Sequence, residues 1–264
     1  MSQARNTYTH GHHDSVLRSH RWRTADNSAA YLLPHLRSGQ RILDVGCGPG
    51  TITIDLARRV DPGTVVGIDY EPAPLEPARA EAAAQGVANV SFAVGDVYQL
   101  DYPEGAFDVV HAHQVLQHLT DPVAALREMR RVCQPGGIVA VRDFDCATMT
   151  WHPADDRLDH WLELYYRITR GNRTEPDAGR RLLSWAQAAG FTAIASSASA
   201  WCFATPEERA WWGGLWADRI TSSALATHDD LAEMAAGFRQ WAARDDGWFA
   251  ILHGEVLCRT PVSS

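Results

Sequence analysis

The sequence lacks the features that would place it outside the cell or in a membrane. Its 264 residues contain no CxxC pair, and the five cysteines are scattered, which is typical of reduced thiols rather than of disulfides or a structural zinc site. No apolar run approaches the roughly 20 residues of a membrane helix. The leading stretch MSQARNTYTHGHHDSV has no apolar core of a secretory signal. We therefore expect a cytoplasmic protein without a membrane partner.

Basic residues are also scarce. The chain carries 24 Lys and Arg against 32 Asp and Glu, a formal net charge of −8. An acidic chain gains no general attraction to nucleic acid or to anionic lipid, so a nucleic-acid substrate is not expected. The head of the chain is rich in histidine, but no Asp, Glu or Cys completes a recognisable ligand spacing there, so no metal is expected. The histidines in question are His10, His12, His13 and His20.

Strand-like and helix-like segments alternate through the first half of the chain, and no internal repeat or low-complexity linker interrupts them. Strands are expected at 41–45, 64–69, 90–96, 107–113 and 136–145, with helices at 27–36, 51–60, 74–86 and 121–133. Strict alternation predicts an α/β domain whose mostly parallel sheet is covered on both faces. The remainder adds an aromatic-rich helical segment at 146–180, helices at 180–191 and 206–244, and strands at 192–204 and 247–261.

Three glycines, Gly46, Gly48 and Gly50, stand between the first strand and the helix that follows it. Such a turn permits positive φ angles and lets the backbone approach a ligand closely. In an open α/β sheet, ligands bind where strands end and helices begin. The glycines occupy every second position, which departs from the G-x-G-x-x-G pattern of dinucleotide sites.

Acidic residues follow the strand ends around this turn. Asp69 closes the second strand, where it can accept hydrogen bonds from ribose hydroxyls. Asp96 closes the third strand, where its carboxylate can bind the exocyclic amine of adenine and Val97 can pack on the ring. A third acid, Asp44, would repel phosphates and attract a sulfonium or an α-ammonium group. The acids therefore favour a cationic nucleoside without phosphates.

The motifs ILDVGCGPG, VGIDY, VGDVYQL and FDVVHAHQVLQHLTDPVAALREMRRVCQPGG carry a resemblance to a known family. In residues 39–145 the sequence resembles the class I S-adenosylmethionine-dependent methyltransferases, in the small-molecule branch of ubiquinone-type and actinobacterial natural-product enzymes. The resemblance implies a Rossmann-like, doubly wound seven-stranded sheet, mostly parallel with an antiparallel last strand. Within a single domain, 1–264, it implies a helical lid at 1–38, a cofactor-binding core at 39–145, and substrate-side helices and last strands at 146–264.

The resemblance also implies a cofactor site for S-adenosylmethionine, with S-adenosylhomocysteine as the product. The methionine part falls to Asp44, Gly46, Cys47, Gly48 and Gly50; the ribose to Asp69 and Tyr70; the adenine to Gly95, Asp96 and Val97; the region of the methyl donor to His113, Gln114 and His118; and the lid to Tyr8 and Arg23. Cys47 is interpreted as a small filler of the turn rather than as a nucleophile. Of His111 and His113, only one can face the ligand, and His113 is favoured because it ends its strand.

Catalytic and substrate-binding residues are predicted from position and residue type. His113 is the first candidate for a general base near neutral pH, and Asp143 and Asp145 are second candidates. Nine of the ten tryptophans follow residue 150, and aromatic walls suit a flat acceptor and a sulfonium cation. Trp161 and Tyr165 share a helix face. The predicted substrate contacts are Arg142, Phe144, Trp161, Tyr165 and Asn172.

These features predict methyl transfer to an aromatic or heteroaromatic small molecule in bacterial secondary metabolism. The head segment and the tryptophan-rich cover resemble enzymes acting on indole alkaloids, including C-methylation of tryptophan-derived cyclic dipeptides. The alternative acceptor is a phenol or quinol, methylated on oxygen or carbon. Two other classes stay open: a nicotinamide-dependent oxidoreductase and a non-catalytic cofactor-binding protein. The sequence is compatible with a monomer or a homodimer.

Overall fold

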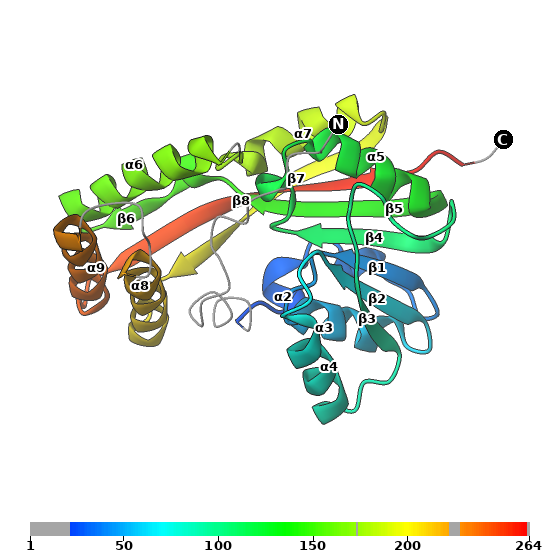
Figure 1. Ribbon diagram of the computed structural model, residues 1–264, viewed down its shortest axis with the longest axis horizontal. Helices are drawn as coiled ribbons and strands as arrows, with labels where there is room; N and C mark the ends of the chain where they lie inside the picture. Colours follow the sequence, from blue (N-terminus) through cyan, green and yellow to red (C-terminus); the bar gives the residue numbers. More distant parts are fainter. Residues whose placement is uncertain (1–21, 173, 222–227, 263–264) are drawn as a thin grey trace.

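The computed structural model describes residues 22–172, 174–221 and 228–262. Its centre is a mixed sheet in the order β3-β2-β1-β4-β5-β8-β6, with β7 paired along the other edge of β8 (Figure 1). The strands are β1 Arg41–Val45, β2 Thr64–Asp69, β3 Val90–Val94, β4 Phe107–His113, β5 Cys133–Phe144, β6 Thr150–His152, β7 Ala193–Phe203 and β8 Trp248–Arg259. Strands β1 to β5 run parallel, and β8 is antiparallel to β5. The predicted α/β sheet is confirmed, and the short β6 is one strand more than expected.

Helices cover both faces of the parallel part because its strands are apolar on both sides. Leu43 and Val45 of β1 pack in one cluster with residues of α5 Pro122–Val132 and α7 Ala178–Ala188. Ile42, on the opposite face, packs with residues of α3 Thr51–Val60. A smaller cluster seats α4 Leu75–Ala84 against β3. Burial on both faces is the usual environment of parallel strands.

The first described segment differs from the single helix expected at 27–36. It forms a short helix, α2 Ala25–Ser28, and then a 3-10 turn, η1 Leu33–His35. Thr24 caps α2 by accepting from the amide of Asn27 at 3.2 Å. Pro34 explains the interruption, because proline lacks the N–H and clashes with the preceding helical turn. The predicted lid residues before Trp22 lie outside the described part of the chain.

The second half of the chain forms a separate aromatic core at the N-terminal end of β8. This core joins α6 Asp156–Gly171, α8 Pro206–Thr221 and α9 His228–Ala242, which lie beside the start of β8 in Figure 1. Trp161 of α6 contacts Trp216 of α8 with ring centroids 4.4 Å apart, and it meets Phe238 of α9 edge-on at 5.0 Å. In the described residues, no helix is both long and apolar enough to cross a bilayer.

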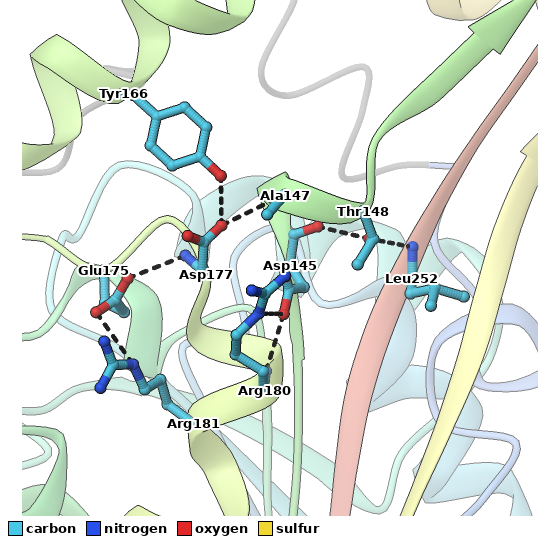
Figure 2. A network of polar contacts seen from close by, with 9 residues as sticks. All are labelled: Asp145, Ala147, Thr148, Tyr166, Glu175, Asp177, Arg180, Arg181 and Leu252. Atoms are coloured by element: carbon cyan, nitrogen blue, oxygen red, sulfur yellow. Dashed lines mark hydrogen bonds and ion pairs between the residues drawn. The ribbon is translucent and has the colours of Figure 1, made fainter.

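A network of charges fastens this second half to the end of β5 (Figure 2). Asp145 pairs with Arg180 of α7 through two contacts of 2.6 and 2.7 Å. Asp177, just before α7, accepts from the Tyr166 hydroxyl of α6 at 2.6 Å and from the Ala147 amide at 2.9 Å. The helical segment is therefore tied to the sheet by directional bonds as well as by apolar packing. The boundaries predicted inside the single domain stay a prediction.

Candidate functional site

A cavity of about 230 Å³ opens at the carboxyl ends of β1, β2 and β4. This edge of an open α/β sheet is the usual place for ligands. The predicted cofactor residues in its lining are Arg23, Asp44, Gly46, Cys47, Gly48, Asp69, Tyr70, Gly95, Asp96, Val97, His113, Gln114 and His118. Gly50 lies outside the lining and begins α3 with a φ of 79°. Tyr8 lies outside the described residues.

The glycine turn is locked to the end of β2. Gly46 and Gly48 adopt positive φ angles of 69° and 53°, which favour glycine. The Gly48 amide donates to the Asp69 carboxylate at 2.9 Å, and the Glu71 amide donates to its other oxygen at 3.0 Å. Asp69 thus holds the turn open while its carboxylate stays at the cavity wall. Farther along this edge, Asp96 accepts from the Tyr98 amide at 2.9 Å.

Asp44 is buried and held from two sides. Its carboxylate accepts from Thr53 of α3 at 2.6 Å and contacts His111 Nδ1 of β4 at 2.7 Å. His111 is fully buried next to it, because Asp44 and His111 are register partners on neighbouring strands. His111 therefore acts as a support for Asp44. His113, and not His111, was predicted to face the ligand, and the supporting position of His111 was not predicted from the sequence.

Carboxylates dominate the part of the cavity formed by residues 39–145, named here the cofactor half. Asp44, Asp69, Glu71 and Asp96 all line it. Burial and the charges of Asp44 and Asp69 raise the pKa of the Cys47 thiol well above its usual value, so Cys47 stays a neutral thiol. Such a surface attracts a cation and repels phosphates, as expected from the sequence.

His113 ends β4 at the boundary of this half. It is 5% exposed, and neither ring nitrogen has a hydrogen-bond partner among the described residues. Its ring lies 5.7 Å from Trp201 and stacks on His253 with centroids 6.3 Å apart. Burial, followed by the positive charges of Arg142 and Arg23, lowers the pKa of His113 well below 6.5. His113 is therefore a neutral imidazole with an unused lone pair at the cavity wall.

His118 lies in the 3-10 turn η2 Leu116–His118 after β4. Its Nε2 is 3.1 Å from the Gln117 amide nitrogen, and burial lowers its pKa to about 3. His118 is thus a neutral residue of the cavity wall near neutral pH, and it does not repel a sulfonium as a cation would.

The three predicted residues around the end of β5 are buried, but none lines the cavity. Arg142 pairs with Glu255 at 3.2 Å and also donates to Ser199 at 3.1 Å. Burial raises the pKa of Asp143 to about 8, and the nearby amides of Gln117 and Leu116 offset only part of that effect. Both carboxylate oxygens of Asp145 are paired with Arg180. The geometry gives these side chains a structural setting, and their predicted catalytic or substrate role gains no support.

Two predicted aromatic contacts lie in the second core instead. Trp161 and Tyr165 share one face of α6 as expected, but that face packs against Trp216 and Phe238. Asn172 ends α6 as its C-cap and also lies outside the cavity lining. Phe144, the remaining predicted substrate contact, does line the cavity. The apolar pattern of α6 gave its buried face, but no local signal tells which partner covers that face.

A second wall of the cavity comes from residues 146–264, named here the acceptor half. An aromatic wall was predicted from the sequence, but its members were not: Met149, Trp201, Trp211, Trp212, Trp216, Ile251 and His253. Trp201 and Trp212 come from β7 and α8, and Phe203 of β7 stacks on Trp212 at 4.2 Å. The Trp201 indole N–H donates to the Asn27 carbonyl at 2.8 Å, which fixes its ring. The alternation of β7 was the available signal, because it points Trp201 and Phe203 inward.

A family model described as a methyltransferase domain matches residues 36–190. The chain belongs to this family. It is 37% identical to an uncharacterised methyltransferase of Schizosaccharomyces pombe, with 95% of each chain covered. It is 40% identical to the 27-O-demethylrifamycin SV methyltransferase of Amycolatopsis mediterranei, over 44% of this chain and 42% of that one. The fold matches Haemonchus contortus phosphoethanolamine N-methyltransferase 2, solved with S-adenosylhomocysteine, at a TM-score of 0.58 and 20% identity, covering 89% and 52%.

The protein is thus an S-adenosylmethionine-dependent methyltransferase that acts on a small molecule, and a nicotinamide-dependent oxidoreductase is set aside. The cofactor half fits this cofactor chemically. Its carboxylates suit the sulfonium, the ammonium group, the ribose hydroxyls and the adenine amine, and their negative charge would repel a pyrophosphate. Within the described residues, no group of three or more His, Cys, Asp or Glu side chains is arranged to hold a metal ion.

Proposed function

We propose that this methyltransferase transfers the methyl group to a flat aromatic or heteroaromatic molecule, in the cytoplasm and in bacterial secondary metabolism. One observation carries the proposal: the glycine turn with its carboxylates and the tryptophan wall border the same cavity. Aromatic rings give a flat acceptor a large contact area at fixed orientation. The relative that acts on demethylrifamycin SV adds support for a natural-product acceptor.

The protein's contribution to the reaction is alignment. S-adenosylmethionine supplies an activated methyl group on a sulfonium. The glycine turn, Asp69 and Asp96 would hold the nucleoside of the bound cofactor, and Asp44 would hold its ammonium end. The tryptophan wall orients the acceptor, and its ring faces favour a nearby cation. Proximity and orientation can account for about 7–11 kcal/mol of barrier lowering in the best cases.

His113 removes the proton that the acceptor must lose. It lies where the cofactor half meets Trp201, and it is neutral with a free lone pair. A base is needed only where the attacking group becomes nucleophilic, or the product neutral, by losing a proton. An indole N–H, a phenol O–H and a quinol O–H all meet that condition.

The indole ring of a tryptophan-derived cyclic dipeptide is the first candidate acceptor. It would be methylated on a ring carbon, with the ring N–H as the proton that His113 receives. The tryptophan-rich wall supports this candidate, because stacked indole faces suit both the flat ring and the positive charge that develops on it during attack.

A phenol or quinol is the second candidate, and the charge of the acceptor side favours it. Arg219 of the acceptor half lines the cavity, as does Arg23 of the N-terminal segment beside Gln114, whereas the lining carboxylates all belong to the cofactor half. Cations near the acceptor lower the free energy of a phenolate and raise that of a protonated amine. Amines are therefore the acceptors that this site disfavours.

The test is a mass-spectrometric screen of the purified protein with S-adenosylmethionine. The panel contains tryptophan cyclic dipeptides, simple indoles, phenols, quinols and amines. A product heavier by one methylene on an indole supports the first candidate, and one on a phenol or quinol supports the second. Methylation confined to amines, or no product with any class, contradicts the proposal.

A further inference from the structure

Gln114 follows β4 directly, and in the described chain it is the one non-glycine residue with a positive φ, 54°. This conformation is unfavourable for a side chain of its length, and such residues cluster at functional sites. Its backbone amide donates to the Arg142 carbonyl at 2.7 Å. The turn therefore places the Gln114 side chain in the cavity lining, between Arg23 of the N-terminal segment and His253 of β8.

The Gln114 amide bridges two partners. Its Oε1 accepts from Arg23 Nη2 at 2.7 Å, and its Nε2 lies 3.0 Å from His253 Nε2. An arginine can only donate hydrogen bonds, so the amide oxygen must be the atom that faces Arg23. The amide NH₂ then faces His253, whose Nε2 must accept with its lone pair.

The proton of a neutral His253 is therefore on Nδ1. Burial, with the charges of Arg142 from β5 and Arg23 from the N-terminal segment, lowers the pKa of His253 well below 6.5. The backbone of Ile251 offsets part of this lowering of the pKa, and Nδ1 has no hydrogen-bond partner among the described residues. Protonation on Nδ1 gives the less common tautomer of a histidine in water, so the bond to Gln114 has a testable consequence.

The two stacked imidazoles of the cavity thus differ. His253 uses its lone pair to accept a hydrogen bond from Gln114, whereas neither nitrogen of His113 has a partner among the described residues. The rings lie nearly parallel, 18° apart, so without this bond either one could offer a lone pair to the cavity.

We propose that Gln114 is a positioning residue that fixes the proton of His253 on Nδ1 and so leaves His113 as the single proton acceptor of the pair. The role of His113 in this statement rests on the proposed methyl transfer. The state of His253 does not, because it follows from the bonds of the protein alone. The chain Arg23–Gln114–His253 joins the N-terminal segment, the end of β4 and β8 in one hydrogen-bonded line.

The test is ¹⁵N NMR of protein labelled on histidine, without acceptor and near neutral pH. The His253 signals are assigned from their loss in His253→Gln. The wild type is expected to show Nδ1 protonated and Nε2 unprotonated for His253. Protonation of Nε2 in the wild type overturns the proposal, and this reading needs no variant of Gln114 that folds.

Gln114→Glu provides the matching perturbation. A carboxylate still accepts from Arg23 but offers His253 no N–H, so His253 should take a second proton and its pKa should rise by about one unit or more. Gln85→Glu is the control, because Gln85 also accepts from an arginine, Arg58, but at an exposed helix end. An unchanged His253 spectrum in Gln114→Glu overturns the proposal.

Kinetics separate this proposal from the proposed function. With an active acceptor, Gln114→Glu should lower kcat about tenfold or more and shift the acidic limb of its pH profile toward higher pH, with S-adenosylhomocysteine affinity retained. A fall in cofactor affinity equal to the fall in kcat contradicts a positioning role. If no acceptor is methylated but the tautomer is as stated, the proposed function fails and the assignment of His253 stands.

Discussion

The two walls of the cavity are built in different ways. In the cofactor half, the carboxylates lie at the ends of strands or within two residues of them, and local bonds such as Gly48 to Asp69 fix them. In the acceptor half, the lining comes from β7, α8, β8 and the turn after β5, and contacts between distant rings fix it. The first wall is a property of the sheet edge, and the second is a property of packing.

This difference should separate the effects of substitution. A change in a carboxylate of the cofactor half, such as Asp69 or Asp96, should weaken cofactor binding. A change in the acceptor half should leave cofactor binding intact and affect acceptor binding, and a change at His113, on the boundary, should affect chemistry alone.

The largest effect is expected at the boundary. His113→Ala removes the neutral imidazole, and turnover should fall by about 100-fold or more, since general bases contribute roughly 10²–10⁴. Cofactor affinity should change little, because no cofactor contact depends on a proton there. Steady-state kinetics and calorimetry on the same sample measure both. The exposed His35→Ala is the control, and unaltered turnover in His113→Ala would remove it from the mechanism.

Asp69→Ala tests the cofactor half, because it should weaken the binding of S-adenosylmethionine. It removes the carboxylate that accepts from Gly48 and that is expected to bind the ribose. Loss of charged hydrogen bonds of about 1.5–3 kcal/mol each should weaken S-adenosylmethionine binding by about 100-fold. Calorimetry measures the affinity, with the exposed Asp101→Ala as the control. Equal affinity in Asp69→Ala and the wild type would contradict the site assignment.

The pH dependence of stability tests the buried groups of both halves. The pKa values of His113 and His253 lie well below 6.5, that of His118 is about 3, and that of Asp143 is about 8. Below pH 6.5 the unfolded chain binds three protons on these histidines that the native state does not. Native Asp143 keeps one proton that the unfolded state lacks at any pH above 3.8, the ordinary pKa of an aspartate.

The difference, three protons minus one, means that stability falls as the pH drops from 6.5 to 5. The free energy of unfolding should decrease by up to about 3 kcal/mol per pH unit. Urea unfolding at several pH values measures the slope. His253→Gln should reduce it by about half and His35→Gln should not, whereas a flat profile for the wild type would show that these histidines are not buried as neutral groups.

A smaller effect is expected for a substitution in the acceptor half, which should change acceptor binding and not cofactor binding. Trp211 is half-buried and lines the cavity, so Trp211→Leu should raise the acceptor KM about tenfold, as expected for loss of one aromatic contact. Its effect on cofactor affinity should be slight. Trp248→Leu is the matched control, because Trp248 is 40% exposed and lies outside the lining. A cofactor affinity lowered as much as in Asp69→Ala would contradict the claim that the two halves bind different molecules.

The smallest effect concerns the charge network that ties the second half to β5. Arg180→Ala leaves Asp145 without its partner, although the arginine side chain is 52% exposed and water softens the loss. Stability should fall by about 1 kcal/mol. Arg181→Ala, next in the chain, loses only an exposed pair to Glu175 at 3.5 Å and should have almost no effect. Thermal unfolding compares the two, and equal losses would deny the network a specific role.

The same difference between the two walls explains which residues of the site could be predicted from the sequence. Gly46, Asp69 and Asp96 could be predicted because strand ends and turns are local, and the parallel sheet brings such ends to one edge. The turn after β4 was not predictable in detail, because a positive φ at Gln114 requires its bonds to Arg142, Arg23 and His253. Local sequence does not encode such bonds.

In the acceptor half, the sequence identified the kind of residue but not the position. Trp161 and Tyr165 have the spacing of one helix face, and that face is covered by α8 and α9. Trp201 and Trp211, which line the cavity, follow β4 by about ninety positions in sequence. The pairing of β7 with β8 places Trp201 there, and the ring contact of α8 with Phe203 of β7 places Trp211. Long-range packing decides between two equally aromatic surfaces.

The central claim is that the methyl group sits where the two halves meet. The most direct test is an NMR measurement on the complex with S-adenosylmethionine that carries a ¹³C-labelled methyl group. Nuclear Overhauser effects from this methyl to the His113 ring and to the indole rings of the acceptor half are expected, and the contacts to His113 should vanish in His113→Ala. Contacts from the methyl to protons of the cofactor half alone would contradict the claim.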